Sequence, residues 1–345
     1  MPLPNQAGVR YTRAASLSYG MPAKLMGGTM NTKRAIMLAA TSLAAAFLSN
    51  GTLGSRATAQ QPPKQETLSE TYRVTRANDV EFQKIAPFKV FDNLYYVGPG
   101  YVGVWLIPTS QGIIMIDSAQ EPYVDFVMDN IKKAGFDLKD IKYILISHGH
   151  LDHFGGAARI QEASGARVAA LDEDWQMIEQ VGTRPGRGGG PPPRVPKRDM
   201  VVKEGDTLTL GGTTMKFYHH PGHTPGVLSA EFTVYDNGAP HKALWQGGGG
   251  SRGGLPEAEQ AIVTTNRLAA LEGIEVLVMI HSWAAGTGGY PNGGVLERAQ
   301  LLAKRKPGDP HPFVDPAAWT QYIKQAQVNA AKTLEEERQK AAAAR

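Results

Sequence analysis

The chain has 345 residues, of which 42% are hydrophobic and 20% are charged. This composition excludes a disordered chain and is sufficient for one large domain or two modest ones. Because the chain contains no cysteine, its fold is built without disulfides.

The sequence pI of about 9 reflects an uneven distribution of charge. Residues 1–59 contain six Lys or Arg and no Asp or Glu, so 30 of the 36 basic residues remain to balance 32 acidic ones. The chain beyond residue 59 therefore has a net charge of −2. This balance excludes the basic patch that nucleic-acid binding requires, and we expect a small-molecule substrate instead.

The first 59 residues have the pattern of an export signal. A Lys-Arg pair precedes the mostly apolar segment 35–48, and a small-residue Ala-Thr-Ala site ends at residue 59. The segment is too short and too interrupted to span a bilayer, so no stable membrane anchor is expected; an uncleaved anchor is the alternative. We predict an exported, periplasmic protein whose mature chain begins near Gln60. Met30, just before the charged pair, is an alternative start of the chain.

Residues 60–85 are polar and predict a loose lead-in to a single domain over residues 86–345 that ends in a C-terminal helix. The domain opens with three β-rich segments separated by turn residues, which predict an antiparallel meander: 89–97, 102–108 and 111–117. Helical spacing follows over 121–134 and ends at Gly135. Strands and helices in alternation indicate an α/β fold.

The run His148-Gly149-His150-Leu151-Asp152-His153 follows the apolar segment 142–147, which has the length and composition of a buried strand. Neutral imidazole and carboxylate are ordinary ligands of zinc and related metals. In an extended segment residues i and i+2 point the same way, so His148 and His150 can hold one ion. Asp152 and His153 come where the chain turns into a helix and would face a second ion, about 3.5–4 Å from the first. The alternative is a polar loop with three unrelated histidines.

The next elements are a strand over 167–171 between helices over 157–163 and 172–181. Residues 182–198 then contain a Gly-Gly-Gly-Pro-Pro-Pro run and four Arg, a composition that cannot build a packed core. They predict a mobile surface loop, and a flap that covers the substrate is the alternative.

A strand over 213–218 leads to a second cluster, His219-His220-Pro221-Gly222-His223. A third imidazole is needed beside His148 and His150 to complete a tetrahedral zinc with one open position. We predict that His223 supplies it, because glycines and prolines on both sides hold it in a tight turn. His220 is the alternative, and otherwise it and His219 support the site or the fold.

The apolar segment 276–280 repeats the pattern of a buried strand that ends in a histidine, here His281. We predict that His281 joins Asp152 and His153 at the second metal, and the alternative is a histidine that caps the strand for packing reasons. Helices over 293–304 and 316–342 complete the chain, the last with a charged, alanine-rich end.

These motifs, in this order, resemble the metallo-β-lactamase superfamily over residues 88 to 323. The resemblance implies a four-layer αββα sandwich, two mixed sheets covered by helices, with the metals at one edge. Within the superfamily the chain is most similar to the subclass 3 enzymes of class B. These also combine a histidine triplet with an Asp-His pair and lack a cysteine ligand, and segments 92–97 and 311–316 resemble them too.

One segment departs from the relatives. Glyoxalase-type, lactonase and RNA-processing members carry a bridging aspartate after the strand that here spans 242–246, whereas this chain has glycine at 247–250. The subclass 3 lactamases are expected to use Ser or Thr near this position to hold the substrate carboxylate. We therefore consider Gly247, Ser251 and Arg252 as candidate substrate contacts, and a merely flexible turn as the alternative.

The resemblance implies a hydrolase with two zinc ions. The first would be held by His148, His150 and His223, and the second by Asp152, His153 and His281, with Asp152 also orienting a zinc-bound hydroxide that attacks a β-lactam amide. A lactone, an ester or another amide is the alternative substrate. The other alternative is a metal-binding relative without catalytic activity.

Overall fold

The computed structural model describes residues 10–12, 66–186, 189–251, 253–281 and 293–344. They belong to one compact unit. The predicted export signal lies almost entirely outside the description, so export stays a prediction. Among the described helices, none is both long and apolar enough to cross a membrane.

The first sheet has seven strands in the order β2-β3-β4-β5-β6-β7-β8. Strands β2 to β5 pair antiparallel and form the predicted meander, and β5 to β8 pair parallel. The predicted strand over 89–97 is two strands, because a turn at Asp92 and Asn93 bonds to the other sheet through Tyr235 O and Thr233 O. The bounds are Phe88–Phe91, Leu94–Tyr96, Trp105–Thr109, Gly112–Ile116, Ile141–Leu145, Arg167–Leu171 and Met200–Val202.

The second sheet has six strands in the order β1-β9-β10-β11-β12-β13, of which only β12 and β13 pair parallel. Strands β9 and β11 were not predicted from the sequence, although alternate residues of β11 from Ala230 onward are buried, as in a strand with one face on the core. The bounds are Arg10–Thr12, Thr207–Leu210, Thr213–His219, Leu228–Asp236, Ala239–Gln246 and Val276–Met279.

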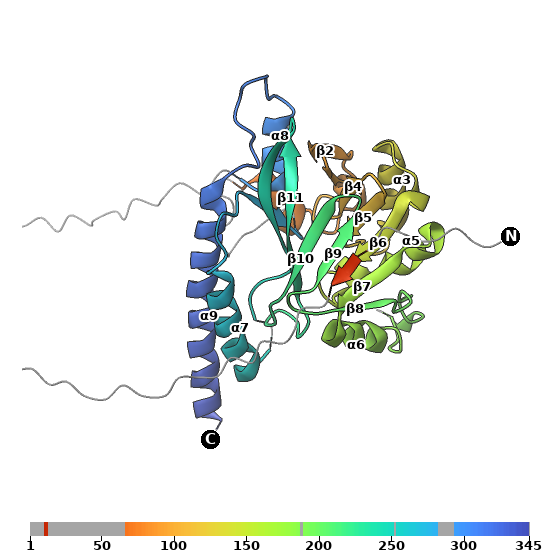
Figure 1. The fold of residues 1–345 in the computed structure, drawn as a ribbon. Helices are drawn as coiled ribbons and strands as arrows, with labels where there is room; N and C mark the ends of the chain where they lie inside the picture. The colour runs from red at the N-terminus through yellow and green to blue at the C-terminus, as the bar shows by residue number, and fades with distance from the viewer. Residues whose placement is uncertain (1–9, 13–65, 187–188, 252, 282–292, 345) are drawn as a thin grey trace, which may run out of the picture. The chain divides into compact units, whose positions relative to one another are not determined.

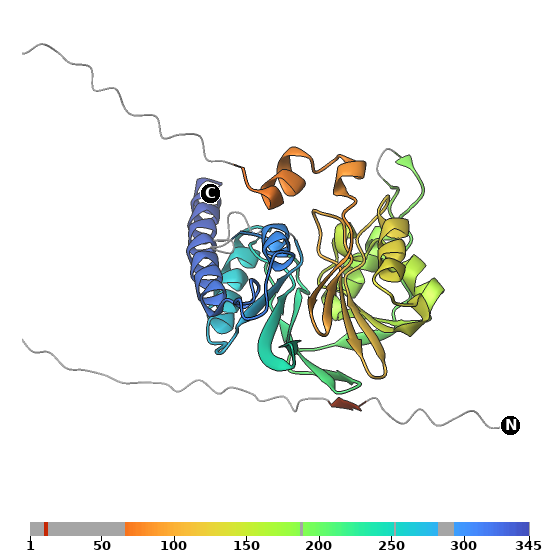
Figure 2. The ribbon, with the colours of Figure 1, turned by 90° about the horizontal axis from the view of Figure 1, so that it is seen from above.

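The two sheets face each other and helices cover their outer sides (Figure 2). Trp105 and Ile107 of β4 pack into a core with Phe217 and Trp245 of the second sheet, whereas Leu106 between them points to the core under the helices. This alternation buries both faces of the strand and forms the predicted αββα sandwich.

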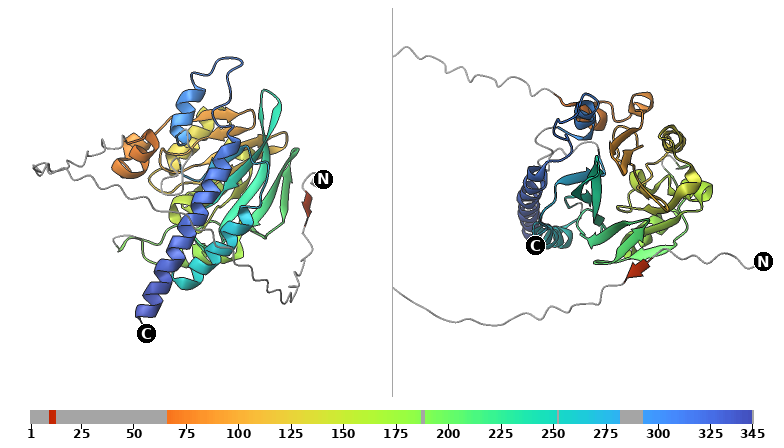
Figure 3. Two further views of the ribbon diagram at one scale, coloured as in Figure 1. Left: turned by 90° about the vertical axis from the view of Figure 1, so that its left-hand side faces the viewer. Right: turned by 45° about the horizontal axis from the view of Figure 1, so that its top comes forward.

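The helices of the first sheet's outer side are α3 (Val124–Lys133), α5 (Ala157–Ser164) and α6 (Asp172–Val181), with the short η2 (Leu138–Asp140) between them. On the other side, α7 (Leu255–Leu268) and α9 (Pro316–Ala343) lie side by side (Figures 1 and 3). Helix α8 (Val295–Leu302) packs on the N-terminal segment, against α1 and β2. The predicted bounds of β7 and α6 agree with the structure.

The lead-in is more ordered than predicted. It contains α1 (Leu68–Glu70), a π-helical turn η1 (Thr71–Thr75) and α2 (Val80–Gln83). Ser69 donates from its N–H and its hydroxyl to the Glu297 carboxylate, at 2.7 and 2.5 Å, and the buried Gln83 amide donates to Tyr72 O. Glu297 is far from Ser69 in the sequence, and Gln83 is buried only in the folded chain. The polar composition of the segment therefore does not predict this order. Between residues 182 and 198 the described residues form no strand and no α-helix, as predicted.

Candidate metal centre

The candidate ligands follow the ends of strands. His148 and His150 come after β6 and before the short helix α4 (Leu151–Phe154), which carries Asp152 and His153. His223 lies in the loop between β10 and β11, and His281 follows β13. Ligands from both sheets therefore meet at one edge of the sandwich.

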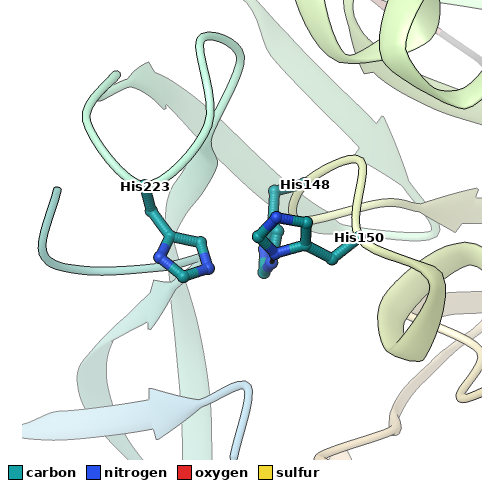
Figure 4. Close-up of side chains that lie close together, drawn as sticks. All are labelled: His148, His150 and His223. Carbon is teal, nitrogen blue, oxygen red and sulfur yellow. Dashed lines mark hydrogen bonds between the residues drawn. The ribbon is translucent and has the colours of Figure 1, made fainter. Parts of the chain in front are cut away.

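The first triad consists of His148, His150 and His223, whose ligand atoms all lie within 4.8 Å of one another. His148 Nε2 and His150 Nδ1 are 3.0 Å apart, and the rings converge on a common space (Figure 4). The structure thus brings His223 into the group rather than the alternative, His220. His220 is buried, with Nε2 3.4 Å from Ser229 Oγ, and burial lowers the pKa of its imidazole to about 3.

The second triad consists of Asp152, His153 and His281, again with all ligand atoms within 4.8 Å. Asp152 Oδ2 is 3.5 Å from His153 Nε2 and 3.8 Å from His281 Nε2. His153 Nε2 is buried and has no hydrogen-bond partner among the described residues. A buried ring nitrogen that has no hydrogen-bond partner and is directed at a carboxylate fits a metal ligand.

The spacing of the donors also fits metal binding. Nitrogen and oxygen ligands at about 2.0–2.1 Å from a tetrahedral zinc are roughly 3.3 Å from each other. The separations of 3.0, 3.5 and 3.8 Å in the two triads bracket this value. The donor spacing in both groups is therefore compatible with an ion held between the ligand atoms.

Three of the imidazoles are oriented by a hydrogen bond from the opposite ring nitrogen. Nδ1 of His148 donates to Gly247 O at 2.9 Å, Nδ1 of His153 to Asp117 Oδ2 at 2.8 Å, and Nδ1 of His281 to Tyr101 O at 3.0 Å. A proton on Nδ1 leaves Nε2 with a free lone pair that faces the centre. This arrangement is typical of metal-binding histidines.

Burial lowers the pKa of His148 and of His281 well below the usual histidine value, so both are neutral near pH 7. Burial opposes ionisation of Asp152, but His153, His281 and Arg73 outweigh it and lower the pKa of that carboxyl to about 2. Burial also disfavours a charged His153, yet Asp152 and Asp117 outweigh this effect and raise its pKa. Two carboxylates thus favour a positive charge here, which a proton or a metal ion can supply.

Sequence reasoning missed Asp117, which positions the second triad. It follows β5, is fully buried and has a φ of +56°, a conformation that non-glycine residues rarely adopt. Its carboxylate accepts hydrogen bonds from Ser147 N–H and Ser147 hydroxyl, each at 2.8 Å, besides the one from His153. An acidic residue directly after a buried strand was the available signal.

Asp174 of α6 was also missed, and it connects the two histidine loops of the first triad. Its buried carboxylate accepts from Gly149 N–H at 2.8 Å, from Thr224 Oγ1 at 2.7 Å and from Gly226 N–H at 2.9 Å. One carboxylate therefore fixes the loop of His148 and His150 against the loop of His223. Nothing in the local sequence distinguishes it from the other acidic residues of the helix.

The glycine run lies beside the first triad. A Cβ on Gly247 would be 1.7 Å from Leu228 O, so no side chain fits there, and a Cβ on Gly248 would be 3.5 Å from the His223 ring. Ser251 Oγ is buried without a hydrogen-bond partner among the described residues, and Arg252 is outside them. The substrate-binding roles of Gly247, Ser251 and Arg252 remain predictions.

The family model of the metallo-beta-lactamase superfamily matches residues 97–235. A hydroxyacylglutathione hydrolase of Pseudomonas putida (strain GB-1) is 32% identical over 135 residues, which cover 37% of this chain and 42% of that protein. The hydroxyacylglutathione hydrolase GloC of Haemophilus influenzae is 30% identical over 178 residues, 48% of this chain and 78% of that one. The chain thus matches less than half of the length of the first relative.

Solved structures give longer matches. BJP-1, a subclass B3 metallo-beta-lactamase of Bradyrhizobium japonicum, is 32% identical with a TM-score of 0.64, covering 75% of this chain and 97% of that one. FEZ-1 from Legionella gormanii is 28% identical with a TM-score of 0.64, covering 74% and 97%. With the two triads, these matches indicate a dinuclear metal site. The chain belongs to the metallo-β-lactamase superfamily, as its three histidine motifs predicted, and its neighbours among solved structures include subclass B3 enzymes.

Proposed function

We propose that this protein is a zinc-dependent β-lactamase. The observation that supports the proposal best is the pair of complete triads with no aspartate at 247–250. Glyoxalase-type relatives are expected to have a bridging aspartate after the strand that is β12 here. In this chain His148 donates to a backbone carbonyl at that place, that of Gly247.

Zinc is favoured by the donor set, which is five imidazoles and one carboxylate without a thiolate. When bound, two zinc ions lower the pKa of a coordinated water and polarise the substrate carbonyl. The chain's own part is orientation. Asp152 stays ionised near neutral pH and can orient the attacking water by accepting a hydrogen bond at Oδ2, while Asp117 and Asp174 keep the histidines in place.

A thioester hydrolase is the second candidate, because the curated relatives are hydroxyacylglutathione hydrolases. To separate the two, the zinc-loaded protein is assayed with a chromogenic cephalosporin, a carbapenem and S-lactoylglutathione, with and without a chelator. We expect chelator-sensitive hydrolysis of the lactams. Hydrolysis of the thioester alone would favour the second candidate, and no turnover with two zinc ions bound would contradict both.

The ligand assignment is tested with His223→Ala. We expect the variant to lose bound zinc and at least about a hundredfold in kcat/KM, because a metal position without its third imidazole binds weakly. His241→Ala is the matched control, since His241 lies outside both triads, with Nδ1 3.4 Å from Glu275. Full activity of His223→Ala with unchanged zinc content would contradict the assignment.

A further inference from the structure

A cleft of about 310 Å³ opens beside the first triad, between the N-terminal end of α7 and the loop of His223. His150 and His223 form part of its wall, so the cleft is directly accessible to a molecule held at the triad. The rest of the wall comes from α6, from the loop after His223 and from α7. None of these other wall residues belongs to either triad.

Part of the wall is apolar. Met177 of α6 lies directly over the ligand loop, because a Cβ added to Gly149 would be 3.0 Å from Met177 Sδ and 3.1 Å from Met177 Cγ. Pro225 and Pro256 add further apolar surface to the cleft. A substituent that enters beside His150 therefore contacts a thioether and two proline rings.

Another part of the wall carries an acidic side chain. Glu257 lines the cleft from the first turn of α7, with its side chain exposed. The side chain folds over Gly253, since a Cβ there would be 2.4 Å from Glu257 Cδ. Among the described residues no Lys, Arg or His forms an ion pair with Glu257. An acidic residue at this position also favours the helix N-terminus, and this role is compatible with a second one.

We propose that this cleft receives an uncharged or cationic substituent of the substrate, and that Glu257 disfavours a carboxylate there. The proposal rests on the proposed hydrolase function and adds the charge class of the group beside the first triad. Two like charges about 5 Å apart in water repel each other by about 0.8 kcal/mol, which corresponds to about a fourfold change in affinity. Salt weakens such a repulsion between exposed charges.

The test uses two thiols that differ by one carboxylate, benzyl mercaptan and 4-(mercaptomethyl)benzoate. Their affinities for the zinc-loaded protein are measured by calorimetry for the wild type, Glu257→Gln and Glu259→Gln. Glu259 is the matched control, because it is exposed on the same helix and does not line the cleft. We expect Glu257→Gln to tighten binding of the carboxylate thiol about fourfold, less at high salt, and to leave the neutral thiol unchanged.

An equal effect on both thiols, no effect, or the same effect in Glu259→Gln would overturn the proposal. So would a wild-type preference for the carboxylate thiol that disappears in Arg252→Gln, because Arg252 would then set the charge of the cleft. Hydrolysis is followed in parallel with paired substrates, neutral and carboxylate-bearing. If both substrates are hydrolysed and Glu257→Gln leaves their turnover unchanged, only the cleft assignment is wrong. If neither substrate is hydrolysed but the binding preference is intact, only the hydrolase function is wrong.

Discussion

At the scale of single residues, the centre depends on two buried carboxylates that touch no predicted substrate. Asp117 accepts the Nδ1 proton of His153, and Asp174 accepts three hydrogen bonds from the loops that carry the first triad. Both side chains are fully buried. Burial of a carboxylate is costly unless its oxygens are well bonded, so these residues are maintained by the hydrogen bonds they accept.

Asp174→Asn tests whether Asp174 holds the loop of His148 and His150 against the loop of His223. The amide keeps the size of the side chain but offers only one accepting oxygen, so either Gly226 N–H or both Gly149 N–H and Thr224 Oγ1 lose their acceptor. We expect a loss of about 1–3 kcal/mol in the free energy of unfolding and about 10–100-fold weaker zinc binding. Urea denaturation and chelator competition measure the two effects. Glu173→Gln, an exposed neighbour on α6, should change neither; a wild-type zinc affinity in Asp174→Asn would contradict the role.

At the scale of elements, the metal ligands follow the ends of strands, and polar contacts attach the β11–β12 hairpin to its neighbours. The hairpin of β11 and β12 is attached to the segment after α8 by Arg305, which donates to both carboxylate oxygens of Asp236 at 2.8 and 2.7 Å. The hairpin also bonds to the turn between β2 and β3, where Asp92 accepts from Gly238 N–H at 3.0 Å. A bidentate pair of this kind fixes the relative orientation of the two side chains and also strengthens their interaction.

The Asp236–Arg305 pair predicts a stability that depends on pH. The hydrogen bond from Arg305 lowers the pKa of Asp236, and burial opposes this only in part. Because the folded pKa is depressed, the stabilisation is present above the unfolded value of about 3.9 and is lost as the pH falls through the folded pKa. We expect Asp236→Asn to cost about 1–2 kcal/mol at pH 7 and progressively less as the pH falls below the unfolded value.

Urea denaturation of the chelated wild type and variant over this pH range measures the difference. Asp129→Asn is the control, because Asp129 and Lys132 form a pair whose side chains are 62% and 63% exposed, and such pairs contribute less than about 1 kcal/mol. A cost of Asp236→Asn that does not change with pH would contradict the assignment.

At the scale of the whole molecule, each triad joins the two halves of the sandwich. The first takes His148 and His150 from the end of β6 and His223 from the second sheet, and the second combines α4 with His281 after β13. A bound ion would therefore connect the two sheets at this edge. Metal binding to the folded chain alone adds stability that grows with the logarithm of the metal affinity.

Removal of the metal should lower the stability of the whole fold. At a free zinc concentration of about 100 times Kd, binding contributes about 2.7 kcal/mol, so we expect the Tm to fall by several degrees on chelation and to recover when zinc is added back. Calorimetry of the loaded and chelated protein measures this shift. His281→Ala, which removes one ligand, should show a smaller shift, and an identical Tm with and without chelator would refute the prediction.

The sequence by itself determined the centre of this protein to a large extent. The motif from His148 to His153 lies within six residues, and its grouping into two triads follows from strand and turn geometry that is encoded locally. His223 was recognisable from the Gly and Pro residues of the tight turn around it, and His281 because it ends a β-rich segment. The fold followed from the family resemblance, and the structure has the predicted sandwich.

Only the tertiary structure decided which groups hold those ligands and what surrounds them. Asp117 reaches His153 across 36 positions in the chain, and Asp174 reaches Gly226 across 52. The cleft lined by Met177 and Glu257 likewise joins α6 to α7. Hydrophobic periodicity and turn residues reflect interactions between neighbours in the sequence. The hydrogen-bond partners of a buried carboxylate are set only when distant elements pack together, so no local sequence pattern predicts them.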